Sequence, residues 1–218
     1  MSDALGEVRD RLRSSLGARV TTGRPLGPLT TYRVGGPAAL FVVVESEQDL
    51  LEIRAALSSQ AVPVLVVGKG SNLLVSDRGF QGVAVQLGSG FQGIELPASA
   101  HRSARAPSID QGAPLVVRAG AAVAMPVLAR KTVEAGLSGL EWAVGVPGSV
   151  GGAVRMNAGG HGSDTAGSVV RVRWIDLWDD AGGDDPPEWL HLGYRSSTLL
   201  PSQVVLGAAF SVTPGDRE

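Results

Sequence analysis

Apolar positions near the start of the chain recur at helical spacing. Residues 3–16 are therefore predicted to form an amphipathic helix that ends at Gly17, with four apolar residues on one face: Leu5, Val8, Leu12 and Leu16. The segment that follows, residues 25–37, is too rich in proline and glycine for regular structure. It is either a connecting loop or a segment that lies along a ligand, and the pattern alone does not decide between them.

Short apolar runs and helical patterns then alternate. Residues 38–44 and 64–67 are predicted buried strands, and Ser46 with Asp49 forms a capping-box pattern at the start of a helix between them. A parallel crossover of this kind is expected to be right-handed. The other predicted elements are strands at 83–87, 115–119, 169–177 and 204–212 and a helix at 125–135.

Two polar segments are predicted to lie at the surface. Residues 97–111 form an expected exposed loop whose charges are solvated: His101, Arg102 and Arg105. Residues 179–187 combine aspartate, glycine and proline, which favours a hairpin turn over a metal site.

Glycine is concentrated in clusters, since the chain has 30 glycines among its 218 residues, roughly twice average usage. The densest run spans residues 144–162. Flexible linkers are usually polar and Ser-rich, whereas this run carries valines at apolar spacing. We interpret it as a rigid loop whose backbone N–H groups face an anionic ligand.

A second cluster, residues 68–75, directly follows the predicted strand at 64–67. Its sequence matches neither the Walker A motif nor G-x-G-x-x-G. Ligands of open α/β sheets bind beyond the carboxyl ends of strands, so the position is informative. The cluster is either a tight turn or a pyrophosphate cradle made by the amides near Gly70, Ser71 and Asn72.

The composition excludes several classes of function. A net charge of −2 does not indicate a nucleic-acid or membrane surface. The absence of cysteine excludes disulfides and thiolate chemistry, and three scattered histidines do not make a zinc motif. Without a signal-peptide pattern or an apolar run of membrane-spanning length, we expect a soluble cytoplasmic protein with no nucleic-acid or membrane partner.

Four motifs occur in a fixed order: T-T-Y-R-V-G-G at 30–36, G-K-G-S-N-L-L-V at 68–75, G-L-E-W-A-V-G-V-P-G-S-V-G-G-A-V-R-M-N-A-G at 139–159 and G-Y-R-S-S at 193–197. Together they resemble the UDP-N-acetylenolpyruvoylglucosamine reductase family over residues 25–212. The resemblance implies an α+β, two-lobed FAD-binding fold of the vanillyl-alcohol-oxidase (PCMH) type. It places one lobe at 1–88 and the other at 89–218, with FAD held noncovalently between them.

The resemblance also implies which residues contact FAD, mostly through their backbone. His161 is not expected to attach the flavin covalently, and Arg155 is expected to be exposed. The predicted cofactor-binding residues are Thr31, Tyr32, Arg33, Val34, Gly35, Val67, Gly68, Lys69, Gly70, Ser71, Asn72, Leu73, Gly145, Val146, Pro147, Gly148, Ser149, Val150, Gly151, Gly152, Asn157, Ala158 and Gly159.

In the family, NADPH reduces FAD, and the reduced flavin passes a hydride to the enolpyruvyl group of UDP-N-acetylglucosamine enolpyruvate. The product, UDP-N-acetylmuramate, is a peptidoglycan precursor, which connects the activity to cell-wall biogenesis, cell shape and cell division. Arg195 matches the catalytic arginine of the family, and a permanently charged, fork-shaped group suits the developing carboxylate charge. Tyr194 is expected to orient it.

The sequence also departs from the family pattern. The family has a third, substrate-binding domain that supplies a proton-donating serine in an S-x-F-x-N-P motif and a glutamate, and neither motif occurs in this chain. Ser196 and Ser197 are not at the matching place. Three hypotheses remain: a truncated reductase, a flavin-binding module that is noncatalytic or pairs with a partner chain, and an oxidase of the same fold.

Overall fold

The computed structural model describes residues 3–58, 62–98 and 115–215. The chain divides into two compact units, which are treated separately. Unit 1 comprises Met1–Phe91, Trp174–Gly183 and Leu199–Val204, and unit 2 comprises Gln92–Arg173, Asp184–Thr198 and Val205–Glu218. The charges predicted to be solvated at His101, Arg102 and Arg105 lie outside the described residues.

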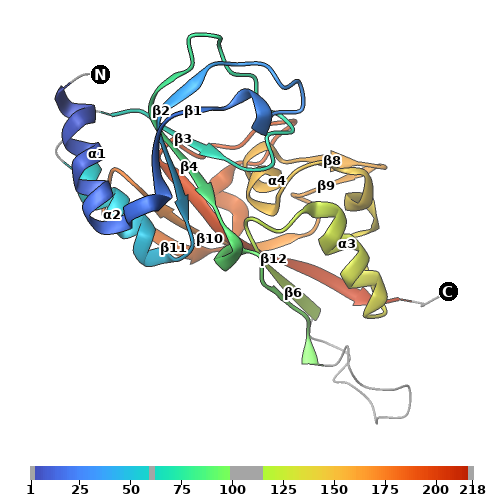
Figure 1. Cartoon of the computed structure of the whole chain (residues 1–218). Coiled ribbons are helices and arrows are strands. Elements are labelled where there is room, and N and C mark those ends of the chain that lie inside the picture. Colours follow the sequence, from blue (N-terminus) through green and yellow to red (C-terminus); the bar gives the residue numbers. More distant parts are fainter. Residues whose placement is uncertain (1–2, 59–61, 99–114, 216–218) are drawn as a thin grey trace. The chain divides into compact units, whose positions relative to one another are not determined.

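Unit 1 is built on a four-stranded sheet of order β1-β2-β4-β3 (Figure 1). Strand β1 is antiparallel to β2, whereas β2 and β3 each pair in parallel with β4. The predicted crossover from β2 to β3 therefore passes over the position that β4 occupies. The strands are β1 (Val20–Pro25), β2 (Pro37–Val44), β3 (Val64–Val67) and β4 (Phe80–Leu87).

Two helices of unit 1 confirm the predictions made from their sequence patterns. Helix α1 (Asp3–Leu16) buries the predicted apolar face, and helix α2 (Glu47–Leu57) begins with the predicted capping box of Ser46 and Asp49. Strand β1 was not predicted, because Val20 is its one buried residue and the apolar alternation of a strand is missing. Short 3-10 helices η1 (Gly17–Arg19), η2 (Gly27–Leu29) and η3 (Ser89–Phe91) connect these elements.

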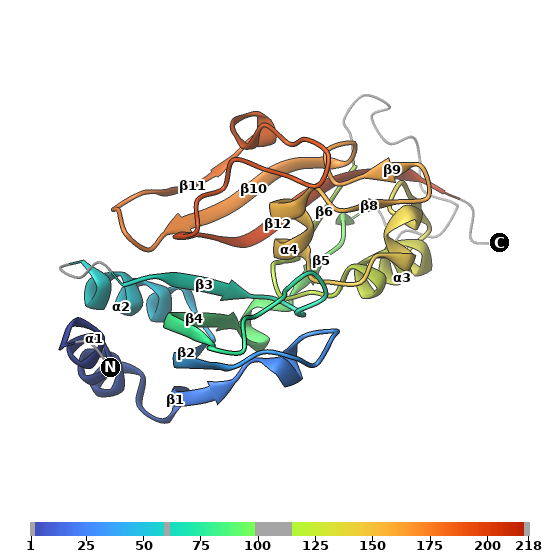
Figure 2. The same cartoon turned by 90° about the horizontal axis from the view of Figure 1, so that it is seen from above.

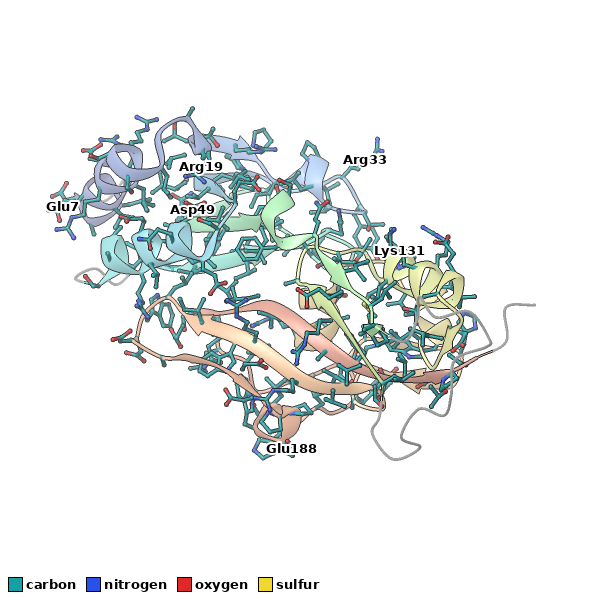
Figure 3. The ribbon with its side chains drawn as sticks, turned by 90° about the horizontal axis from the view of Figure 1, so that it is seen from below. Glu7, Arg19, Arg33, Asp49, Lys131 and Glu188 are labelled. Carbon is teal, nitrogen blue, oxygen red and sulfur yellow. The ribbon has the colours of Figure 1, made fainter. Side chains whose placement is uncertain are left out.

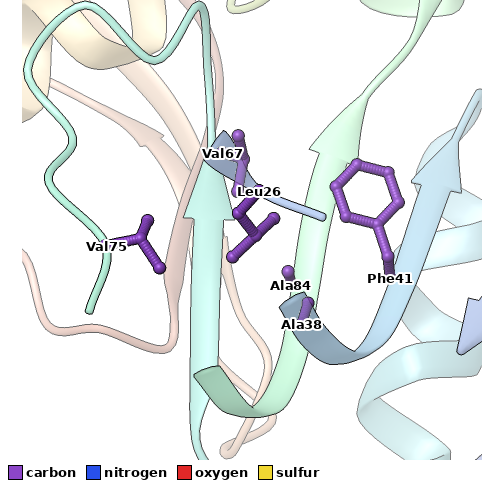
Figure 4. Close-up of a cluster of buried hydrophobic side chains, with 6 residues drawn as sticks. All are labelled: Leu26, Ala38, Phe41, Val67, Val75 and Ala84. Carbon is purple, nitrogen blue, oxygen red and sulfur yellow. The ribbon is translucent and has the colours of Figure 1, made fainter. Parts of the chain in front are cut away.

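A buried apolar cluster of unit 1 fixes the loops at one end of its sheet (Figure 4). Its strand residues are Ala38, Phe41, Val67 and Ala84, and Leu26 and Val75 come from the connecting segments. The cluster therefore anchors the segments before and after the sheet strands to the same core.

A second sheet has the order β11-β10-β12-β6-β5, and β7 pairs with β12. Strand β12 is antiparallel to both β6 and β7. The strands are β5 (Ile94–Glu95), β6 (Leu115–Gly120), β7 (Leu137–Ser138), β10 (Val169–Asp176), β11 (Gly182–Asp185) and β12 (Gln203–Pro214). The predicted turn at 179–187 thus contains a short strand, β11.

The glycine-rich run at 144–162 is mostly regular structure, which corrects its interpretation as one loop. After η5 (Glu141–Gly145), residues Val150–Met156 form helix α4, and a hairpin of β8 (Gly159–Gly160) and β9 (Ser163–Asp164) follows (Figure 2). The remaining elements of unit 2 are α3 (Met125–Glu134) and η6 (Pro187–Leu190). None of the helices within the described ranges is long and apolar enough to cross a membrane.

Candidate functional site

Two predicted loops of unit 1, loop 30–36 and loop 68–75, touch through their main chains. The Thr31 N–H donates to the Gly70 carbonyl oxygen at 3.2 Å. Gly70 has a φ of +67°, and a Cβ added there would lie 1.8 Å from the Leu29 carbonyl oxygen. Only glycine fits this contact. Gly70 is therefore required for the packing of the loops, whatever they bind.

The same loops present backbone donors and exposed apolar side chains. Within the described ranges, the N–H groups of Lys69, Gly70 and Asn72 have no hydrogen-bond partner. Tyr32 is 71% exposed and Leu74 is 75% exposed. Unpaired amides with fixed dipoles suit an anion, and exposed rings and aliphatic groups suit an apolar ligand surface.

Arg33 is at the tip of loop 30–36, where its side chain points away from the ribbon (Figure 3). Its φ is +55°. Such a conformation is uncommon for a residue with a Cβ and is often found at functional sites.

In unit 2, the segment before α4 has a similar character. Gly148 has a φ of +132°, and its carbonyl oxygen accepts from the Met125 N–H at 3.0 Å. In the part of unit 2 that the structure describes, the N–H groups of Gly148 and Ser149 have no hydrogen-bond partner. The Ser149 side chain caps α4 by accepting from the Gly152 N–H. This segment, like loop 68–75, offers backbone donors rather than charged side chains.

Several predicted cofactor-binding residues are buried in the protein itself. These residues are each no more than 8% exposed, so little of their side chains is available to a ligand: Val67, Val146, Ser149, Val150, Asn157 and Ala158. The polar side chains among them are held by hydrogen bonds within unit 2. Arg155 is partly buried, not exposed as expected, and burial lowers the pKa of its guanidinium below the ordinary value.

The predicted catalytic pair forms a tight turn of unit 2. The Gly193 N–H donates to the Ser196 carbonyl oxygen at 3.1 Å, and the Ser196 N–H donates to the Gly193 carbonyl oxygen at 3.2 Å. Tyr194 and Arg195 are the two central residues, and Tyr194 is 94% exposed. Arg195 has a φ of +54° at a turn position that usually carries glycine or asparagine. The exposed guanidinium is thus presented on a strained turn.

Two polar side chains near this turn were not predicted to form the hydrogen bonds that the structure shows. Asn157 donates to the Gly193 carbonyl oxygen and to Asp164, and Ser197 donates to the Arg155 carbonyl oxygen. No local sequence pattern identifies the bonds to Gly193 and Arg155, because these two carbonyl groups lie 36 and 42 positions away from Asn157 and Ser197 in the chain.

A surface groove of about 340 Å³ lies between α3 and η5. Its walls are Ala129, Arg130, Val133, Glu134, Glu141 and Val144. The groove contains none of the predicted site residues. Among the described residues, no group of three or more His, Cys, Asp or Glu is placed to hold a metal ion.

Residues 38–183, more than half of the chain, match the FAD binding domain family. The chain belongs to this family. FAD is therefore the cofactor that these loops are expected to bind. Within unit 1, the unpaired amides of loop 68–75 suit a pyrophosphate, and the open glycine backbone allows close approach. Within unit 2, the segment before α4 offers donors of the same kind.

Comparison with individual proteins confirms the resemblance to the reductases. The chain is 42% identical over 197 residues to the UDP-N-acetylenolpyruvoylglucosamine reductase of Caulobacter vibrioides (strain NA1000 / CB15N), covering 88% of this chain and 59% of that protein. The reductase of Rubrobacter xylanophilus is 41% identical, with 89% and 60% covered. The chain thus spans about three-fifths of the length of these relatives.

Solved structures confirm the fold. The reductase of Thermus caldophilus aligns with a TM-score of 0.69 at 31% identity, covering 91% of this chain and 63% of that one. Berberine bridge enzyme aligns with a TM-score of 0.64 at 12% identity, covering 99% of this chain and 45% of that one, which shows a shared fold alone. The expectation of an α+β flavoprotein fold of the vanillyl-alcohol-oxidase type is therefore confirmed.

Proposed function

We propose that this chain provides the FAD-binding part of a UDP-N-acetylenolpyruvoylglucosamine reductase. The activity is the NADPH-dependent reduction of UDP-N-acetylglucosamine enolpyruvate to UDP-N-acetylmuramate in peptidoglycan precursor synthesis. The observation that carries this proposal is the exposed Arg195, held on a strained turn, in a chain 42% identical to a reductase over 197 residues.

The roles proposed for the cofactor and for the loop residues follow from their chemistry. Bound FAD would supply the hydride chemistry of both half-reactions. Loop 68–75 and the segment before α4 would hold the cofactor through their N–H groups, which need no reorganisation to accept an anion. Tyr32 and Leu74 would cover apolar parts of the cofactor.

Arg195 is proposed to act on the substrate. Hydride addition to the enolpyruvyl group places negative charge next to the carboxylate, and a guanidinium can pair with both carboxylate oxygens. Tyr194, as the adjacent residue of the turn, would contact the same part of the substrate.

The test separates the two half-reactions in the purified, FAD-loaded chain. Arg195→Ala should slow reoxidation of the reduced flavin by the enolpyruvyl substrate by about 10²–10³-fold, the usual effect of losing a charge-stabilising donor. Reduction of the flavin by NADPH should change little, because the arginine does not act in that step. Stopped-flow absorbance at the flavin band measures both rates.

Three results would contradict the proposal. Equal slowing of both half-reactions would remove Arg195 from this role. A wild-type chain that binds FAD but is not reoxidised by the substrate would instead be a flavin-binding module that needs a partner. A chain that neither has a flavin band nor binds added FAD would contradict the cofactor assignment itself.

A further inference from the structure

The turn that carries Arg195 is tied to the C-terminal end of α4 by two side chains. The Asn157 Nδ2 donates to the Gly193 carbonyl oxygen at 3.0 Å. The Ser197 Oγ donates to the Arg155 carbonyl oxygen at 2.6 Å. Gly193 and Ser197 lie on opposite sides of the turn in the chain, so the arginine is held from both sides.

The orientation of the Asn157 amide is fixed by its surroundings. Asn157 is the C-cap of α4, has a φ of +39° and is 6% exposed. Its Nδ2 also donates to Asp164 Oδ2 at 3.0 Å, and its Oδ1 accepts from the Ala166 N–H at 2.9 Å. Both donor positions therefore face acceptors and the oxygen faces a donor, so the reverse orientation would be unfavourable. Burial strengthens these bonds.

The partner of this amide is fixed as well. Asp164 Oδ1 accepts from the Gly167 N–H at 3.1 Å, which leaves Oδ2 directed to Asn157. Asp164 in β9 thus orients the Asn157 amide, and the Asn157 amide in turn holds the Gly193 carbonyl of the turn.

Such support is needed because the turn is strained. Arg195 adopts a positive φ that a residue with a Cβ disfavours, and strained backbone persists only where neighbouring structure holds it. A charge-stabilising group works through preorganisation, and a misplacement of about 1 Å can cost about 10²-fold in rate.

We propose that Asn157 and Ser197 are positioning residues that fix the Arg195 turn against α4. The inference rests on the proposed function for the role of Arg195, but not for the hydrogen bonds themselves. In this proposal the Asn157 side chain positions the Arg195 turn and does not contact FAD. Neither residue touches the substrate in this proposal.

Hydrogen exchange tests the positioning without any need for activity. Asn157→Gly tolerates the positive φ but removes the amide side chain. It should speed exchange of the Ser196 amide by tenfold or more. His191→Gly is the matched control, because His191 is exposed, has a φ of +41° and precedes the same turn. That control should leave the Ser196 amide within about threefold of wild type.

Ser197 provides an independent pair of variants. Ser197→Ala should also speed exchange at the turn, and Ser197→Thr, which retains the hydroxyl, should restore protection. Unchanged exchange in Asn157→Gly and Ser197→Ala, or equal acceleration in His191→Gly, would overturn the proposal.

The half-reactions give the second measurement, in the FAD-loaded chain. Asn157→Gly and Ser197→Ala should slow substrate-dependent flavin reoxidation by 10- to 100-fold, with FAD affinity and NADPH-dependent reduction within about twofold of wild type. A loss of FAD affinity as large as the loss of rate would make Asn157 a cofactor ligand instead. If the wild-type chain is not reoxidised by substrate, the proposed function fails, and the exchange measurement still decides the positioning role.

Discussion

At the scale of single residues, strain is found at predicted site positions. Five non-glycine residues have a positive φ in the segments that the structure describes: Arg33, Asn157, His161, His191 and Arg195. Arg33, Asn157 and Arg195 were predicted to contact cofactor or substrate. His161 and His191 have the same kind of conformation without having been predicted as site residues, so the roles of the other three stay predictions.

Gly70 offers a sharp test of loop packing. Gly70→Ala should destabilise unit 1 by more than about 2 kcal/mol, because a positive φ alone costs an L residue about 1–2 kcal/mol and a Cβ would also meet the Leu29 carbonyl oxygen. FAD affinity should fall with it. Urea unfolding and FAD titration by flavin fluorescence would measure both quantities.

Gly23→Ala is the matched control. Gly23 has a φ of +64° but no atom within 4 Å of an added Cβ, so this variant has the conformational cost without the clash. Equal losses of stability in the two variants would show that the contact with Leu29 is unimportant.

At the scale of elements, the glycines of α4 are not equivalent. A Cβ on Gly151 would lie 3.1 Å from the Ala121 Cβ, whereas a Cβ on Gly152 would have the Ser149 Oγ at 3.5 Å as its nearest neighbour. The Ala121 N–H donates to the Leu206 carbonyl oxygen, and the Ala121 carbonyl oxygen accepts from the Gly151 N–H. Ala121 therefore has little freedom to move away.

This difference predicts opposite effects of the same substitution. Gly152→Ala should stabilise unit 2 by up to about 1 kcal/mol, the helix-propensity gain of alanine over glycine. Gly151→Ala should lose that gain and destabilise, because the helix must shift away from Ala121. The free energy of urea unfolding measures both. Equal stabilisation by the two substitutions would contradict the packing account of Gly151.

The N-terminus of α2 depends on one carboxylate. Asp49 accepts from the Glu45 N–H at 2.7 Å, from the Ser46 N–H at 3.2 Å and from Arg19 Nη2 at 3.1 Å (Figure 3). Burial by itself would raise the pKa of Asp49, but these hydrogen bonds and the Arg19 charge outweigh it, so the pKa is lowered.

The lowered pKa of Asp49 predicts a loss of stability in acid. The stabilisation is complete above the unfolded pKa of about 3.9 and is lost as the pH falls through the lower folded value. Asp49→Asn should cost about 2 kcal/mol at pH 7 and make unfolding less sensitive to acid below about pH 4. Urea unfolding at a series of pH values would measure this. Asp10→Asn, at an exposed carboxylate, should change little, and an equal acid response in both variants would contradict the prediction.

At the scale of the whole molecule, each unit contains one of the proposed cofactor-binding segments. Saturation with FAD at about 100 times its dissociation constant should stabilise the folded chain by about 2.7 kcal/mol. Hydrogen exchange should slow both in residues 68–73 and in residues 145–152. Protection of one segment alone would remove the other from the proposed site.

The sequence by itself determined the elements whose local pattern is strong. The apolar stripe of α1, the capping box of α2 and the apolar runs of β2 and β3 could be predicted, because each pattern is formed by residues close together in the chain. The motifs also predicted FAD binding, and residues 38–183 match the FAD binding domain family. Strand β1 and helix α4 were missed, since the first has little apolar alternation and the second contains glycines that local propensity disfavours.

Tertiary structure decided what the glycines and polar residues do. Gly70 is required by its close contact with Leu29, and Gly151 lies close to Ala121; both neighbours are remote in the chain. Asn157 and Ser197 acquire their proposed role because folding brings α4 beside the turn of Arg195. Sequence patterns report local periodicity and conformational preference, whereas close approach and hydrogen-bond pairing between distant segments exist only in the folded chain.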